Sequence, residues 1–362
     1  MIMSHEVTKR ADGSYEMAYV GETPWWGGGN KLEPGAPFDE WVKAAGFDFN
    51  IERAPVRFEV GEEVHTVPNK TVLYRSDNLY PLGVMSADKY HIHQPVQILS
   101  YFQRLADRLG FTLETAGTLY GGKQYWALAR VDRGQALDKT GKDIINPFVL
   151  LATSADGSLA THGRFVLIRV VCKNTLQIGL GEDTTAAVRF CHNAEFDADK
   201  MDAGLGLNLR DRFSSTMDLL RSLGSLKISE AEMIKATLEV FTPSVFKQDE
   251  VLFSEALSRR AVLGVNQLAL KHDMIGNDLL EPGTVGAWLQ SVTQYCDHHT
   301  RSRSSDAAAN SALWGAGAKQ KMRAFDTAQL IQNFGGVPVP NGSPFSQISD
   351  EELAAMAWSI AD

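Results

Sequence analysis

Basic residues with the chemistry to bind phosphate gather in one C-terminal segment of the chain. Between residues 301 and 323 five basic residues and a single acidic one, Asp306, give a local charge of +4. The basic residues are Arg301, Arg303, Lys319, Lys321 and Arg323, and Trp314 lies among them. Because Lys and Arg neutralise phosphates and an aromatic ring stacks on a base, this composition is typical of single-stranded nucleic-acid binding.

A second, shorter basic group combines Arg164, Arg169 and Lys173 with the polar residue Asn174. Residues 164 to 173 contain no acidic residue. On a strand, side chains alternate between faces, so we expect Arg169 to point away from Arg164. For both groups, a solvated surface with salt bridges to the many acidic residues remains the alternative interpretation.

Metal ligation and catalysis have weaker support. Cys191 and His192, together with Cys296, His298 and His299, are residue types that bind zinc, but their spacing matches no known finger. A packed thiol and a hydrogen-bonded imidazole are the alternative.

The sequence contains none of the motifs Gly-x-Ser-x-Gly, His-Glu-x-x-His, Cys-x-x-Cys or the phosphate-binding Gly-x-x-x-x-Gly-Lys-Ser/Thr. We therefore assign no catalytic residue, and we expect no cofactor and no bound metal.

Composition restricts the class of protein. The 362 residues carry a net charge of −9 and include three cysteines, and the sequence pI is about 5.5. Such a chain is not a globally basic, histone-like binder, although a local basic groove remains compatible with it. Few, odd and distant cysteines favour a reducing compartment. No apolar run is long enough for a membrane span and no signal peptide is evident, so we expect a soluble cytoplasmic protein.

Hydrophobic periodicity predicts a β-rich first half and a helical second half. Short alternating runs predict strands at 56–60, 64–67, 71–75 and 82–85, with turns at 69–70 and 76–78. A helix is predicted from Gln94–Pro95 to Gly110, followed by a hairpin of 111–119 and 125–131. Further strands are expected at 148–153 and 165–171, and helices after residue 200, including 251–262. The fold class is therefore α+β: an antiparallel, hairpin-rich sheet packed on a helix, followed by a mostly helical C-terminal half.

The predicted domain organisation follows the same change of pattern. It consists of an irregular N-terminal segment 1–50 with the loop Trp25-Trp26-Gly27-Gly28-Gly29, a β-rich α+β core 51–200, a helical region 201–332 with the basic segment, a linker 333–348 and a C-terminal helix 349–362.

Six segments together resemble an uncharacterised phage/plasmid-like protein family, a domain-of-unknown-function family borne on mobile elements. They are 21–27 (GETPWWG), 114–117 (ETAG), 126–129 (WALA), 169–176 (RVVCKNTL), 295–299 (YCDHH) and 314–319 (WGAGAK). The mobile-element setting of that family is similar to that of single-strand annealing recombinases such as phage Red-beta and Erf. This resemblance implies a hairpin-bearing sheet packed on a helix, assembly into rings or filaments, and single-stranded DNA as ligand.

The leading functional hypothesis is a protein that binds and anneals single-stranded DNA without covalent chemistry, as a self-associated ring or filament. A host recombination or replication protein is a possible further partner. Two alternatives stay open: an accessory or anti-defence protein that acts through protein partners, and a metal-assisted enzyme acting on nucleic acid.

Overall fold

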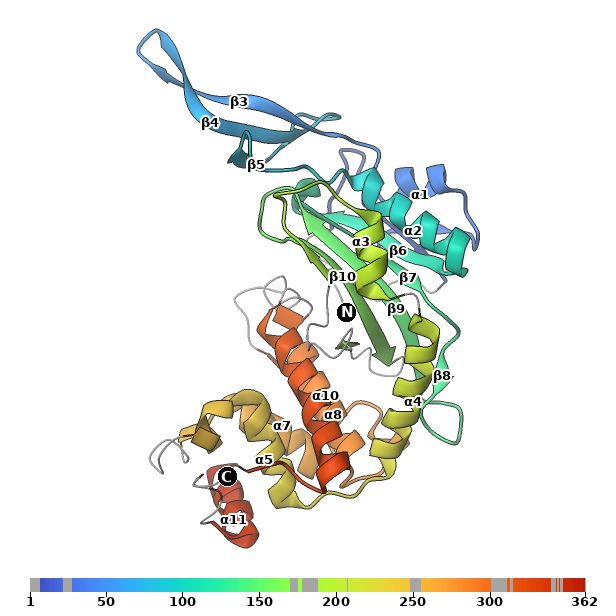
Figure 1. Ribbon diagram of the computed structural model, residues 1–362, viewed down its shortest axis with the longest axis vertical. Coiled ribbons are helices and arrows are strands. Elements are labelled where there is room, and N and C mark those ends of the chain that lie inside the picture. The colour runs from blue at the N-terminus through green and yellow to red at the C-terminus, as the bar shows by residue number, and fades with distance from the viewer. Residues whose placement is uncertain are drawn as a thin grey trace.

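The computed structural model describes residues 7–21, 28–169, 175–177, 188–206, 208–247, 255–300, 311–312, 315–339, 343, 345 and 348–361. It is elongated, with a projecting β-ribbon at one end, a large sheet in the middle and a group of helices at the other end (Figure 1). The Trp25–Trp26 loop lies outside the described residues. The expected α+β class, with helices concentrated in the C-terminal half, is confirmed.

The main sheet is antiparallel except for the parallel pair β1–β2. Its order is β11-β10-β9-β7-β6-β1-β2, with β12 on β10 and β8 on β9. Its strands are β1 (Met17–Val20), β2 (Asn30–Leu32), β6 (Thr112–Leu119), β7 (Gln124–Arg130), β8 (Gln135–Ala136), β9 (Ile144–Ser154), β10 (Thr161–Arg169), β11 (Thr175–Gln177) and β12 (Val188–Phe190). The N-terminal segment expected to be irregular therefore supplies two strands of this sheet.

Three further strands form the projecting ribbon: β3 (Ile51–Val60), β4 (Glu63–Arg75) and β5 (Pro81–Ser86). Two separate strands were expected where β4 runs unbroken, because Asn69–Lys70 reads as a turn. Asn69 does take a left-handed φ of 56°, and the pairing of β4 with β3 is interrupted between Thr66 and Thr71, but β4 continues because its pairing with β5 begins at Lys70.

Helices pack on one face of the main sheet and build the opposite end of the molecule (Figure 1). They are α1 (Phe38–Ala44), α2 (Pro95–Leu109), α3 (Ala198–Leu205), α4 (Leu209–Ser225), α5 (Glu230–Phe241), α7 (Arg260–Leu270), α8 (Val285–Gln294), α10 (Ala316–Phe334) and α11 (Asp350–Ala361). Short helical turns are η1 (Tyr120–Gly122), η2 (Pro243–Lys247), η3 (Asn277–Leu279) and η4 (Tyr295–His299).

Local signals explain several helix ends. Pro95 occupies the first turn of α2, and Gly110 ends that helix with a left-handed φ of 67° that glycine adopts without strain. The Ser229 hydroxyl accepts a hydrogen bond from the Glu232 N–H, as the capping-box spacing predicts. Of the helix expected over 251–262, residues 251–254 lie outside the described residues, 255–257 are helical, and α7 begins at Arg260 after a break at 258–259.

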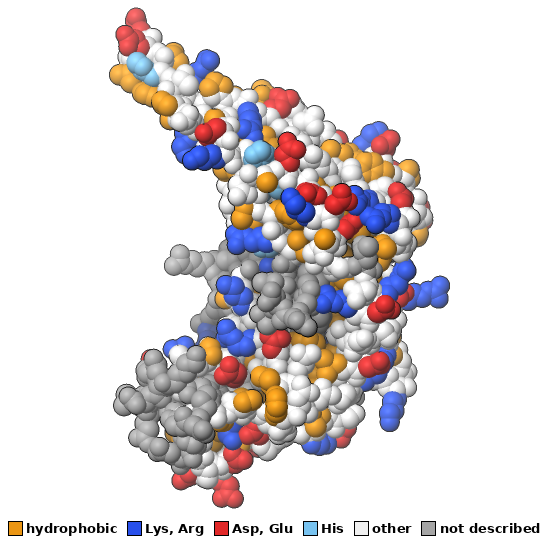
Figure 2. Space-filling model, in the orientation of Figure 1, with side chains coloured by type: hydrophobic (Ala, Val, Ile, Leu, Met, Phe, Trp, Pro, Cys, Tyr) orange, Lys and Arg blue, Asp and Glu red, His pale blue; other side chains and the backbone are white. Residues whose placement is uncertain are grey.

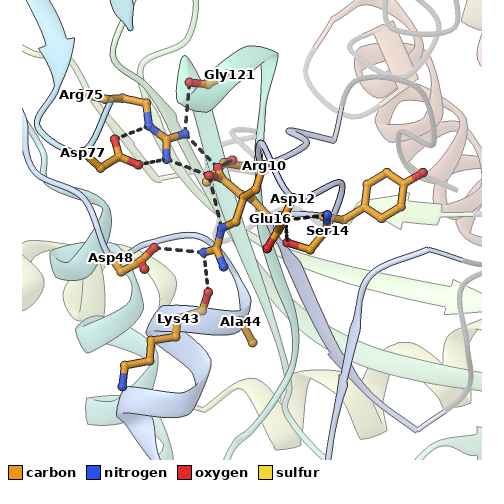
Figure 3. A network of polar contacts seen from close by, with 12 residues as sticks. Arg10, Asp12, Ser14, Glu16, Lys43, Ala44, Asp48, Arg75, Asp77 and Gly121 are labelled. Atoms are coloured by element: carbon orange, nitrogen blue, oxygen red, sulfur yellow. Dashed lines mark hydrogen bonds and ion pairs between the residues drawn. The ribbon is translucent and has the colours of Figure 1, made fainter. Parts of the chain in front are cut away.

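A buried ion pair joins the ribbon to the main sheet (Figure 3). Glu16, just before β1, receives two hydrogen bonds from Arg75 at the end of β4, of 2.7 and 2.9 Å. Arg75 uses its remaining N–H groups on the Asp77 carboxylate and the Gly121 carbonyl, and its guanidinium lies over the Phe49 ring. These carboxylates raise the pKa of Arg75 although burial opposes its charge. Both Arg75 and Glu16 are almost fully buried, so the charges compensate each other rather than being solvated.

Two neighbouring histidines, His93 and His192, lie against each other in the core with their rings tilted by 34°. His93, fully buried, places Nε2 2.9 Å from the Ala194 carbonyl and Nδ1 2.6 Å from the Thr161 hydroxyl. The carbonyl requires a proton on Nε2, so the neutral ring accepts from Thr161 at Nδ1. The ring of His192 lies 4.4 Å from that of His93, and Tyr90 stacks on its other side. Burial lowers the pKa of His93 to about 4 and also lowers that of His192.

The first prediction concerns the buried ion pair. Glu16→Gln leaves the Arg75 charge without its main partner, so we expect a loss of about 3–5 kcal/mol in the free energy of unfolding. The double variant Glu16→Gln with Arg75→Met loses less than the sum of its two single variants, because the orphaned charge is gone. Urea denaturation measures both. Glu52→Gln, an exposed carboxylate on the same ribbon, is the control and changes stability by less than about 0.5 kcal/mol. Equal effects of Glu16→Gln and Glu52→Gln would contradict the role of the pair.

The second prediction concerns acid stability. The pKa of His93 is lower in the folded chain than the ordinary value near 6.5, so between about pH 6.5 and pH 4 the unfolded chain binds more protons. The contribution of neutral His93 to the free energy of unfolding is complete above about pH 6.5. It is lost as the pH falls toward 4, at up to about 1.4 kcal/mol per pH unit. Urea midpoints measured across this range should fall steeply, and His93→Gln should flatten that slope whatever its effect at neutral pH. An unchanged slope in His93→Gln would assign the acid sensitivity to other groups.

Candidate nucleic-acid interface

Two of the expected DNA contacts are buried structural ion pairs. Arg169 at the end of β10 holds Asp143 through two 2.7 Å contacts and also donates to the carbonyls of Ile275 and Gly276. Lys321 on α10 holds Asp297 at 2.5 Å. Both cations are at most 2% exposed. The expectation that Arg169 and Lys321 track phosphates is therefore corrected, since their charges are used to join parts of the fold.

The other residues predicted to contact DNA fall into three groups by their place in the structure. Arg301, Arg303, Lys173, Asn174 and Trp314 lie outside the described residues. On α10, Lys319 is exposed and Arg323 donates a 2.6 Å hydrogen bond to the Val240 carbonyl. Arg164 lies in the main sheet, and, as the alternation predicted, it points to the face opposite that of Arg169.

The proposed metal ligands are not assembled into one site. His192 contacts His91, Thr153 and Leu159 through its ring nitrogens, whereas the Cys296 thiol lies 3.7 Å from Gln320. Burial raises the pKa of Cys296 to about 12, which disfavours the thiolate that zinc binds. His299 Nε2 accepts a hydrogen bond from the Gln294 amide N–H, and Cys191 is exposed. Within the part of the chain that the structure describes, no group of three or more His, Cys, Asp or Glu side chains is placed to hold a metal, and this covers His298.

The face of the main sheet around Arg164 carries cations and aromatic rings in cross-strand rows. Residues paired across antiparallel strands share a face, which defines these rows. One row runs Gly117–Trp126–Ala152–His162–Arg189, the next Thr115–Leu128–Leu150–Arg164, and the third Arg130–Phe148–Val166. We call this sheet face the arginine face; its aromatic rings are buried, with Trp126 6% and Phe148 5% exposed. The three rows hold Arg130, Arg164, Arg189 and His162 and contain no carboxylate among these described residues.

The cations of the arginine face differ in their burial and pairing. Burial and the charges of Arg164 and Arg189 lower the pKa of His162 to about 4. Arg164 is only 7% exposed, and this burial lowers its pKa to about 10. Arg130 pairs with Glu114, the extra residue of a bulge in β6, and its guanidinium lies 5.1 Å from the centre of the Phe148 ring. Arg189 is exposed at the β12 edge.

The rings of this face belong to a second apolar cluster, separate from the core beneath the helices. It contains Trp126, Phe148 and Leu150, and Tyr15 and Tyr120 pack against it. The Trp126 indole N–H is buried without a hydrogen-bond acceptor among the described residues. The sequence pattern identified Arg164, but it missed Arg130 and Arg189, because these residues are far apart in sequence and only strand pairing aligns them.

An open polar cleft adjoins this face. Its volume is about 780 Å³, and it lies between the N-terminal segment, the base of the ribbon and the β6–β7 turn. The Arg75–Glu16 pair lines it, together with Arg10, which donates to Asp48 and to the Lys43 carbonyl (Figure 3).

Comparison with known proteins identifies the family but no activity. No curated protein and no solved structure matches the chain significantly. None of the described helices is long and apolar enough to cross a bilayer. A family model described as "Domain of unknown function (DUF932)" matches residues 81–314, from β5 to the segment before α10, which is more than half of the chain. The chain therefore belongs to the DUF932 family.

Proposed function

We propose that the protein binds single-stranded DNA along the arginine face and promotes annealing of complementary strands. The observation that carries this proposal is the alignment of Arg130, Arg164 and Arg189 with two aromatic residues on one sheet face. Cations spaced along a sheet suit a phosphate backbone, and such binding is tolerant of sequence. The relation to single-strand annealing recombinases and to phages and plasmids remains part of this proposal.

Single-stranded DNA fits better than duplex for a physical reason. The net charge of −9 repels a polyanion unless it follows a local cationic path, and a flexible strand can follow such a path more closely than a stiff duplex.

A second element supports self-association. At the tip of the β3–β4 ribbon, Phe58, Val60 and Val64 are 49–61% exposed, and Figure 2 shows hydrophobic and acidic side chains gathered at this end. A two-stranded ribbon is marginally stable alone in water. Among the described residues, the outer edge of β3 has no paired strand. Because one open strand edge is complementary to the same edge on a second copy, we propose a second copy of this chain as the partner of the ribbon.

The third prediction tests DNA binding. Arg189→Gln removes an exposed cation, so we expect weaker binding and a decrease of about 0.7 in the slope of log affinity against log salt. Fluorescence anisotropy of a labelled oligothymidine at several salt concentrations measures this slope. Lys139→Gln, an exposed cation of the β8–β9 loop, is the matched control and leaves the slope unchanged. A salt-independent affinity of the wild-type protein, or absence of binding, would overturn the proposed function.

The fourth prediction tests the ribbon. The wild-type protein should form oligomers whose mass, measured by light scattering, rises with protein concentration. Phe58→Ser combined with Val60→Ser removes the exposed apolar tip, so we expect it to shift the protein to monomer. Lys70→Ser, exposed on the same ribbon, leaves assembly unchanged. A monomeric wild-type protein, or a tip variant that assembles normally, would contradict ribbon-mediated self-association.

A further inference from the structure

The polar cleft beside the arginine face has the dimensions and lining of a ligand site. Its volume of about 780 Å³ lies in the range of small-molecule sites. Tyr15, Tyr80 and Tyr120 reach it from three different parts of the chain. Tyr80 is 44% exposed, which is high for an aromatic side chain at the base of a sheet.

Charges around the cleft are balanced, which selects against a phosphate. Lys9, Arg10 and Arg75 line it together with Glu16, Asp48 and Asp77. All the N–H groups of Arg75 are engaged by Glu16, Asp77 and Gly121. The side chains of Asp48 and Asp77 are 45% and 41% exposed, so their oxygens can accept from the amino groups of a ligand. A neutral, planar group with polar edges suits this lining better than an anion.

Two tight turns hold the walls of the cleft in an unusual backbone conformation. Leu79 and Tyr120 both adopt left-handed φ values, of 59° and 55°, which cost energy for residues other than glycine. The turns touch: a Cβ at Gly121 would come within 2.6 Å of the Tyr80 ring. The position of the Tyr80 ring is thus fixed by the neighbouring turn, as a preorganised stacking platform requires.

The cleft is continuous with the arginine face, because Val7, Tyr15 and Tyr120 line the cleft and also pack in the apolar cluster of that face. We propose that the cleft takes one unstacked nucleobase of a strand bound along the arginine face, stacked on tyrosine with its polar edge toward Asp48 and Asp77. This inference rests on the proposed function and adds a base-binding subsite to it.

Photocrosslinking tests the subsite without requiring a fixed register. An oligonucleotide in which 5-iododeoxyuridine replaces every thymidine crosslinks to aromatic side chains on irradiation, and mass spectrometry identifies the modified peptides. We expect crosslinks at Tyr80 or Tyr120. Binding by anisotropy without crosslinks at either residue would overturn the subsite and leave the proposed function standing. No binding at all would remove both.

Affinity measurements separate stacking from phosphate contact. Tyr80→Leu should weaken oligonucleotide binding by roughly tenfold with an unchanged salt slope, because stacking on a base releases no counterions. Tyr80→Phe keeps the ring and should bind like the wild type. Tyr74→Leu, a half-buried tyrosine of β4 outside the cleft, is the control. A wild-type affinity for Tyr80→Leu, or a changed salt slope in it, would contradict base stacking at this position.

Discussion

The buried pair of Arg75 and Glu16 is the contact on which the arrangement of the N-terminal half depends. It links the end of β4 to the residue that leads into β1, and Thr118 of β6 donates a further 2.5 Å hydrogen bond to the same carboxylate. The ribbon, β6 and the segment before β1 therefore meet at one carboxylate. Loss of the partner of a buried charge is strongly destabilising. The ion pair therefore restricts the position of the ribbon relative to the sheet more than apolar packing alone would. Gly46 adopts a φ of 76°, and a side chain there would clash with Glu16.

The cost of leaving a buried charge unpaired also accounts for the role of several other basic residues. Arg169 and Lys321 have the residue types expected for phosphate contact, yet each is neutralised inside the protein by one aspartate. Arg169 additionally binds carbonyls of the loop after α7, so it attaches the helical region to the sheet. An excess of acidic residues makes such internal pairing common, and it removes those cations from any surface that could meet a polyanion.

The arginine face and the polar cleft divide the proposed recognition of a strand between them. Guanidinium groups aligned across strands suit the repeating phosphates, whereas the charge-balanced, tyrosine-lined cleft suits a base. The family match covers the strands of the arginine face and β5 of the ribbon, but it begins after β3 and β4. The proposed strand binding and the proposed self-association are thus assigned to different parts of the chain.

Much of the local structure is determined by the sequence alone. Apolar periodicity with Pro95 and Gly110 defines α2, and the tight turn after Leu119 defines the β6–β7 hairpin, because these signals act over a few residues. Strand alternation likewise places Arg164 and Arg169 on opposite faces. The tertiary structure alone determines which charges are paired inside the protein and which lie on a common face. Arg169 pairs with Asp143, and Arg75 pairs with Glu16, which is 59 residues away in the chain. Arg130 and Arg189 lie on the same sheet face as Arg164. Those outcomes depend on strand pairing between distant segments, and no local pattern encodes the partner of a charge.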